Sequence, residues 1–292
     1  MKKKVIAGLV CAMAGIAALW ASTKVSFLLP IATMVISLMT VYEINHALGI
    51  KNIPFRVITM LAGCSFSIHE LLLALVPAYG EIKLNLVYLF LIYGLVIYII
   101  MLTDHENIKF GDASTVFVLS LAIPFAVSRY IYFMNISKYF PDEGLTKAHG
   151  VFLILYVMFC AWLPDVWAYF GGSFFGKHKL CPKISPKKTV EGAVCGAIGG
   201  VISVLILYAV FENFIFAEPR NKYLTVALVS LPVCIISMFG DLTFSVLKRN
   251  CGIKDFSNLV PGHGGVMDRF DSEVFAIIAF YSIMKIFNGV II

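Results

Sequence analysis

The chain has 292 residues, of which 60% are hydrophobic and only 14% are charged, and its mean hydropathy is +0.90. Soluble domains average roughly 45–50% apolar and about 25% charged residues. This composition excludes a disordered chain and argues against a soluble α/β enzyme, which would lack the polar sequence to cover its surface. The net charge of +6 does not indicate a nucleic-acid partner, because in a membrane protein the placement of basic residues matters more than their total.

Nine apolar runs bounded by charge, Pro or Gly approach the roughly 20 residues that a membrane-spanning helix needs. They cover residues 5–22, 25–42, 55–78, 84–102, 114–134, 149–172, 191–211, 223–245 and 272–291. We therefore predict an all-α, polytopic membrane protein with about nine transmembrane helices. The first run follows three lysines, as a signal peptide would, but eight more apolar runs come after it, so we expect an uncleaved first helix.

Basic residues concentrate on one side of this arrangement. The N-terminus and the loops after every second run hold 15 of the 23 Lys and Arg residues: Lys2, Lys3, Lys4, Lys51, Arg56, Lys109, Lys177, Lys179, Lys183, Lys187, Lys188, Lys248, Arg249, Lys254 and Arg269. Cytoplasmic loops are enriched in such residues. This bias predicts a cytoplasmic N-terminus and places the two long polar loops, 173–190 and 246–271, in the cytoplasm.

The two halves of the chain differ in polar content. Residues 1–150 are predicted to be transmembrane scaffold, in which Glu43, His46, His69 and Glu70 are polar exceptions. Intramembrane ionisable groups are candidates for function, but Glu43 and His46 fit a helix end. An interhelical hydrogen bond is the simpler interpretation of His69 and Glu70. We predict that residues 151–292 form the catalytic region.

Two carboxylates interrupt apolar runs in that region. Asp165 lies near the predicted cytoplasmic end of its run, where it needs water, a cation or a hydrogen-bond donor; a helix-end carboxylate bound by loop donors is the simpler alternative. Asp241, Ser245 and Lys248 stand at positions i, i+4 and i+7, so they line one helical stripe. A divalent cation would offset the cost of burying Asp241.

A basic segment precedes the seventh run. Residues 177–188 contain five lysines, which could simply bind anionic lipid headgroups. However, Ser185, Lys187, Lys188 and Thr189 lead directly into a helix N-terminus, and this combination suits phosphate. Glu191 either complements the helix dipole or holds a lysine or a metal-bound water.

A glycine-rich turn precedes the last run. Glycines flank His263, and such turns can direct backbone N–H groups at an anion; His263 is either a turn residue or a donor to phosphate. Asp268 and Asp271 fit a capping box at the start of a helix, but for Asp268 we favour a ligand role. Hard cations such as Mg²⁺ often bind through one or two carboxylates together with substrate phosphates.

At these residues the chain resembles the phosphatidate cytidylyltransferases, also called CDP-diacylglycerol synthases. The family signature is Ser-x-x-Lys-Arg, then Lys-Asp, then His-Gly-Gly-x-x-Asp-Arg-x-Asp. The matching residues are Ser245, Lys248, Arg249, Lys254, Asp255, His263, Gly264, Gly265, Asp268, Arg269 and Asp271. Asp165, the Ser185–Thr189 segment and Glu191 are also similar to the family, so the resemblance covers roughly residues 160–272.

The resemblance implies that phosphatidic acid attacks the α-phosphorus of CTP, giving CDP-diacylglycerol and pyrophosphate. It implies a homodimeric enzyme of the bacterial cytoplasmic membrane, with its active site facing the cytoplasm, that uses Mg²⁺ and K⁺ as a second cation. Asp241 and Asp268 would hold the metal, with Asp165, Glu191 and Asp271 as further candidate ligands. Lys248 and Arg249 join Asp241 and Asp268 as catalytic residues. Substrate contacts would come from Ser185, Lys187, Lys188, Thr189, Ser245, His263, Gly264, Gly265 and Arg269.

Two other functions fit parts of the sequence. A transporter of an anionic solute would use Asp165 and Asp241 for ion coupling, although no internal repeat supports that class. A CDP-alcohol phosphotransferase would carry an Asp-Gly-x-x-Ala-Arg signature, which this sequence lacks.

Overall fold

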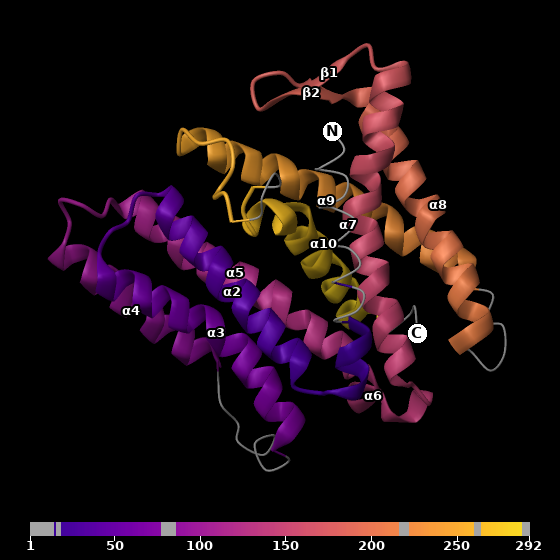
Figure 1. The fold of residues 1–292 in the computed structure, drawn as a ribbon, viewed down its shortest axis with the longest axis horizontal. Helices are drawn as coiled ribbons and strands as arrows, with labels where there is room; N and C mark the ends of the chain where they lie inside the picture. The colour runs from indigo at the N-terminus through magenta and orange to yellow at the C-terminus, as the bar shows by residue number, and fades with distance from the viewer. Residues whose placement is uncertain (1–14, 16–18, 77–85, 216–221, 260–263, 288–292) are drawn as a thin grey trace. The chain divides into compact units, whose positions relative to one another are not determined.

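The computed structural model describes residues 15, 19–76, 86–215, 222–259 and 264–287, which are almost entirely helical (Figure 1). The predicted all-α class is therefore confirmed. The chain divides into two compact units, the first formed by residues 1–132 with 253–268 and the second by 133–252 with 269–292. The predicted functional division at residue 150 stays a prediction. Most of the first predicted run, 5–22, lies outside the described residues.

The first unit is built from four long helices. They are α2 (Leu28–Ala47), α3 (Ile53–Leu75), α4 (Leu86–Thr103) and α5 (Phe110–Met134), which runs two residues past the unit boundary. Helix α3 packs on both α2 and α4. It begins at a side-chain cap, because Asn52 Oδ1 accepts a hydrogen bond from the Phe55 N–H at 2.9 Å. Helix α5 continues through Pro124.

The second unit holds the remaining elements. They are α6 (Ile136–Tyr139), η2 (Pro141–Glu143), α7 (Lys147–Phe175), β1 (Lys179–Cys181), β2 (Ser185–Thr189), α8 (Val190–Ile215), α9 (Tyr223–Asn250) and α10 (Met267–Ile286), whose first two residues belong to the first unit. Helices α7, α8 and α9 pack against one another. The region predicted as the loop 173–190 instead contains an antiparallel β1–β2 hairpin, which lies at one end of α7 and α8 (Figure 1).

Six of the described helices are long and apolar enough to cross a membrane, namely α2, α3, α5, α7, α8 and α9. Helix α4 contributes a shorter apolar stretch and leaves Val87, Leu91 and Leu95 at least 60% exposed, as expected for side chains that contact lipid. Helix α10 begins before the predicted run 272–291. The charged residues in its first turns make it too polar to count as a membrane-spanning helix. The protein is thus an integral membrane protein, while the count of nine spans and the cytoplasmic N-terminus stay predictions.

Small residues bring α7 and α8 together. A Cβ atom added at Gly192 would lie 2.7 Å from the carbonyl oxygen of Ala168, and one at Gly196 would lie 2.7 Å from that of Pro164. Side chains at these two positions would therefore separate the helices, since glycine is what permits this backbone approach. The contact holds the turn of α7 that carries Asp165 against the first turns of α8.

A buried ion pair joins two helices of the first unit. Arg129 Nη2 lies 2.7 Å from Glu70 Oε1, and their side chains are only 7% and 5% exposed. Arg129 also donates to the Ser128 hydroxyl at 3.1 Å. The interhelical, structural interpretation of Glu70 is therefore confirmed, and its partner is an arginine on α5.

Candidate active site

A cavity of about 510 Å³ lies in the second unit, between α7, the β1–β2 hairpin, α8 and α9. Its lining combines carboxylates, lysines, hydroxyls and small or apolar side chains: Asp165, Ala168, Tyr169, Gly172, Ser173, Leu180, Ser185, Lys187, Lys188, Thr189, Gly192, Ala193, Met238, Asp241 and Leu242. Small-molecule sites occupy about 300–1,000 Å³, so the cavity is large enough for a nucleotide. Six of the residues that the sequence singled out line this one space.

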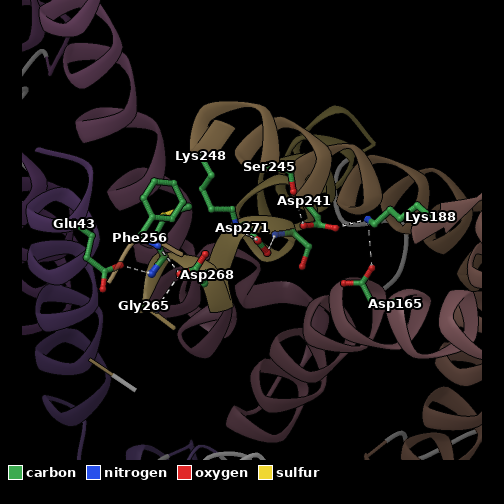
Figure 2. A network of polar contacts seen from close by, with 12 residues as sticks. Glu43, Asp165, Lys188, Asp241, Ser245, Lys248, Phe256, Gly265, Asp268 and Asp271 are labelled. Atoms are coloured by element: carbon green, nitrogen blue, oxygen red, sulfur yellow. Dashed lines mark hydrogen bonds and ion pairs between the residues drawn. The ribbon is translucent and has the colours of Figure 1, made fainter. Parts of the chain in front are cut away.

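Lys188 joins the two intramembrane carboxylates. Its ammonium group forms an ion pair and hydrogen bond with Asp241 Oδ2 and lies 4.0 Å from Asp165 Oδ1 (Figure 2). Strand β2 carries the lysine, whereas α7 and α9 carry the carboxylates. A cation was one of the partners predicted for these carboxylates, and in this structure the side chain of Lys188 supplies it.

The stripe along α9 has the expected geometry. Ser245 Oγ donates to Asp241 Oδ1 at 3.5 Å, one turn away on the same helix. One turn further, Lys248 Nζ lies 3.8 Å from Asp271 Oδ2 of α10. Burial and then the nearby charge of Asp241 raise the pKa of Asp271 to about 7, against the attraction of Lys248. The second unit therefore gathers three carboxylates whose mutual repulsion is relieved by nearby cations or by protonation of one of them.

The hairpin contributes phosphate-type donors and is itself anchored. Ser185, Lys187 and Lys188 line the cavity, whereas Thr189 Oγ1 accepts from the Gly192 N–H at 3.1 Å and so caps the start of α8. Lys187 and Lys188 therefore lie where a phosphate could accept hydrogen bonds from their ammonium groups, whereas the Thr189 hydroxyl acts as a helix cap.

Glu191 holds the base of this hairpin. Its carboxylate accepts from the backbone N–H groups of Lys177 and His178 at 3.1 and 3.2 Å, and its Oε1 lies 2.5 Å from Nδ1 of His178. These contacts favour the interpretation of Glu191 as an anchor of the polar loop. Its assignment as a metal ligand stays a prediction.

In the first unit, Asp268 is bound by backbone donors. Its Oδ2 accepts from the N–H groups of Phe256 at 2.8 Å and Gly265 at 2.9 Å (Figure 2). The Gly265 N–H thus already donates to Asp268. A phosphate could accept a hydrogen bond from this N–H only by displacing the Asp268 carboxylate. Gly264 has a φ of +83°, in the left-handed region that favours glycine.

The other predicted residues are placed differently. His263 lies outside the described residues. Arg249 and Arg269 are exposed and do not line the described cavity. Because Asp241 and Asp268 belong to different compact units, their joint binding of one metal ion stays a prediction.

The donor set of the cavity fits a hard cation. Within the described part of the chain, no group of three or more His, Cys, Asp or Glu side chains is arranged to hold a metal ion. Mg²⁺, however, commonly binds through one or two carboxylates plus substrate phosphates and water. The oxygen atoms that Asp165 and Asp241 direct at Lys188 meet that requirement once a phosphate supplies the rest.

Several residues of the cavity had no signal in the sequence. Leu180, Met238 and Leu242 are ordinary apolar residues there, and only the tertiary structure places them on the cavity wall. Gly172 belongs to the close α7–α8 contact: a Cβ at this position would lie 2.8 Å from Thr189 Oγ1. A run of glycines on adjacent helices is the one signal that could have indicated it.

The chain matches a family model described as "Cytidylyltransferase family" over residues 2–287. It is 41% identical over 174 residues to a phosphatidate cytidylyltransferase of Haemophilus influenzae and 37% identical over 158 residues to one of Bacillus subtilis. These matches cover 59% and 54% of this chain and 56% of each relative. A phosphatidate cytidylyltransferase of Staphylococcus haemolyticus is 32% identical over 242 residues, which cover 76% of this chain and 91% of that protein.

Proposed function

Because the chain belongs to the cytidylyltransferase family, we propose that it transfers the cytidylyl group of CTP to phosphatidic acid. The products are CDP-diacylglycerol and pyrophosphate. The observation that carries this proposal is the cavity in which two lysines, a serine hydroxyl and two carboxylates converge within a unit of lipid-exposed helices. The transporter alternative is not favoured, since the family and the named relatives are transferases.

The chemistry follows from the charges of the reactants. A phosphate oxygen of phosphatidic acid forms a bond to the α-phosphorus of CTP, and the bond from that phosphorus to the bridging oxygen of pyrophosphate breaks. The nucleophile is already an anion, so no strong base is needed. The main obstacle is repulsion between two polyanions, which positioned cationic groups reduce.

The lysines of β2 are suited to that task. Lys187 and Lys188 line the cavity and would contact the phosphates of CTP, with the Ser185 hydroxyl as a further donor. Lys188 is 27% exposed and is held by side chains alone, so it can turn from Asp241 to an incoming phosphate without moving the backbone. Asp241 and Asp165 would keep the lysine oriented until then.

The released carboxylates would then hold Mg²⁺. Asp241 and Asp165 would be its ligands, with Asp271 as a further candidate on the neighbouring helix. Bound Mg²⁺ supplies charge neutralisation at the phosphoryl oxygens. K⁺ as a second cation belongs to the same proposal.

Location and assembly complete the proposal. The enzyme would lie in the bacterial cytoplasmic membrane as a homodimer, with its cavity open to cytoplasmic CTP. The concentration of lysines in the hairpin supports a cytoplasmic position for that face. Phosphatidic acid would keep its acyl chains in the bilayer and present only its headgroup.

The test is an assay of the purified protein with CTP labelled at the α-phosphate and with phosphatidic acid. We expect Mg²⁺-dependent formation of labelled CDP-diacylglycerol, and much slower transfer from ATP, GTP or UTP. A variant that replaces exposed Glu106 by Gln serves as the control for protein handling. Labelled lipid that forms equally from all four nucleotides, or none from any of them, would contradict the proposal.

A further inference from the structure

Glu43 is a buried carboxylate that the cavity does not use. It lies on the apolar helix α2 and is 0% exposed. Its Oε1 accepts from the Ser257 hydroxyl at 2.6 Å and from the Val266 N–H at 2.9 Å, and its Oε2 accepts from the Met267 N–H at 2.7 Å. All of these residues belong to the first unit. A side chain of the N-terminal scaffold is therefore bonded to the loop that carries the glycine-rich motif.

All three partners of Glu43 are hydrogen-bond donors, so both side-chain oxygens at this position must be acceptors. Val266 and Met267 stand at the start of α10, where the first backbone N–H groups have no partner within the helix and the helix dipole favours negative charge. An amide in place of the carboxylate would direct its NH₂ group at one of these two N–H groups, whichever way it is turned. The carboxylate is thus specific to this position.

The same carboxylate explains the second glycine of the motif. A Cβ atom added at Gly265 would lie 2.7 Å from each oxygen of Glu43, closer than atoms in contact can approach. The Gly265 N–H meanwhile donates to Asp268 (Figure 2). Gly265 therefore sits between two carboxylates, one on either side of the loop, and only a residue without a side chain fits there.

We propose that Glu43 is a positioning residue for the proposed reaction, because it holds residues 264–268 in the conformation that fixes the Asp268 carboxylate. This role rests on the proposed function and on the prediction, implied by the family resemblance, that Asp268 is a catalytic residue. Glu43 itself does not touch substrate. It acts through the backbone of the loop, to which it contributes three of the hydrogen bonds in the structure.

Hydrogen–deuterium exchange of the full-length protein in detergent tests the positioning directly. The samples are the wild type, Glu43→Gln and, as a matched control, Glu70→Gln, which alters another buried carboxylate of the same unit. In Glu43→Gln we expect the amides of residues 264–268 to exchange about tenfold faster or more, because a buried hydrogen bond is lost. In Glu70→Gln the exchange of these amides relative to the other amides of the first unit should match the wild type, because loss of that ion pair affects the stability of the unit and not the loop alone. Equal exchange in all three proteins, or an equal rise in both variants, would overturn the proposal.

A milder variant covers the case in which Glu43→Gln does not fold. Ser257→Ala removes one donor to Glu43 and leaves the two backbone contacts in place. We expect about a two- to fivefold rise in exchange, confined to the same loop. Unchanged exchange in this variant, with Glu43→Gln unfolded, would overturn the proposal.

Kinetics separate positioning from substrate binding. For Glu43→Gln we expect kcat to fall about 10- to 100-fold while KM for CTP and for phosphatidic acid changes less than about threefold. Glu43→Asp, which keeps the charge but is one methylene shorter, should restore part of kcat. A raised KM with unchanged kcat would assign Glu43 to substrate binding instead. Failure of the wild type to use CTP would refute the proposed function, whereas the exchange result would still report on the loop.

Discussion

Two regions of the molecule hold buried or half-buried carboxylates in different ways. In the cavity of the second unit, the side chains of Asp165 and Asp241 are 46% and 21% exposed and face the flexible side chain of Lys188. In the first unit, Glu43 and Asp268 are 0% and 9% exposed, and backbone N–H groups bind them.

The difference indicates separate tasks. A carboxylate paired with a lysine side chain can exchange that partner for a cation or a ligand without moving the backbone. A carboxylate bound by backbone N–H groups holds the conformation of a loop, and releasing it leaves buried donors unpaired at a cost of about 1–3 kcal/mol each. The cavity is therefore suited to exchanging ligands, whereas the backbone contacts of Glu43 and Asp268 fix the conformation of the loop. Substitutions in the two regions should separate these tasks.

The largest effect is expected at Asp241. Asp241→Asn keeps the shape of the side chain but removes the charge that faces Lys188, so we expect kcat to fall about 10²- to 10³-fold. The measurement is the initial rate of CTP-dependent CDP-diacylglycerol formation per folded protein. Asp112→Asn, in the first turn of α5, should retain wild-type activity. A rate for Asp241→Asn within threefold of the wild type would remove the cavity from the mechanism.

The second-largest loss of activity is expected for Lys188→Met. Methionine keeps the apolar stem of the lysine but cannot neutralise a phosphate or the two carboxylates, so we expect kcat/KM for CTP to fall about 100-fold. The control is Lys183→Met, because Lys183 is exposed in the same hairpin and does not line the cavity. Steady-state kinetics at several CTP concentrations make the comparison. Equal losses in the two variants would mean that only the charge of the hairpin matters.

Gly265→Ala tests the loop. Its Cβ would meet both oxygens of Glu43, so we expect activity to fall about tenfold through displacement of the loop. In a Glu43→Ala background the space is free, and adding Gly265→Ala should then cost less than about threefold. Activity and thermal unfolding of the four proteins in this cycle provide the measurement. Strictly additive effects would show that the two residues do not interact.

Glu70→Gln should affect activity least. Breaking a buried ion pair costs about 3–5 kcal/mol of stability, so the midpoint of thermal unfolding should fall. Activity per folded protein should stay within about twofold, because Glu70 and Arg129 lie in the first unit and outside the cavity. A loss of activity comparable with that of Asp241→Asn would place this ion pair in the mechanism after all.

The sequence predicted the local parts of the site. Helical periodicity placed Asp241 and Ser245 on one stripe, and the structure joins them by a hydrogen bond. The basic segment before α8 was predicted to suit phosphate, and two of its five lysines, Lys187 and Lys188, line the cavity. These features depend on residues close together in the chain, where 3.6-residue periodicity and composition carry the information.

Long-range contacts were not predictable in the same way. Glu43 was interpreted as a helix-end residue, yet its backbone partners lie 223 and 224 positions further along the chain. The β1–β2 hairpin was expected to be a loop, because a three-residue strand such as Lys179–Cys181 has no detectable alternation. The hairpin is a local feature, whereas the contacts of Glu43 depend on the packing of segments that are distant in the sequence.

The most direct test of the central claim is photoaffinity labelling of the wild-type protein with a photoreactive CTP analogue, followed by mapping of the labelled peptides by mass spectrometry. We expect label in the segments 165–193 and 238–242, which contain the residues that line the cavity, and we expect excess CTP to prevent it. Label that appears only in other parts of the chain, still prevented by CTP, would contradict the assignment of the cavity as the nucleotide site.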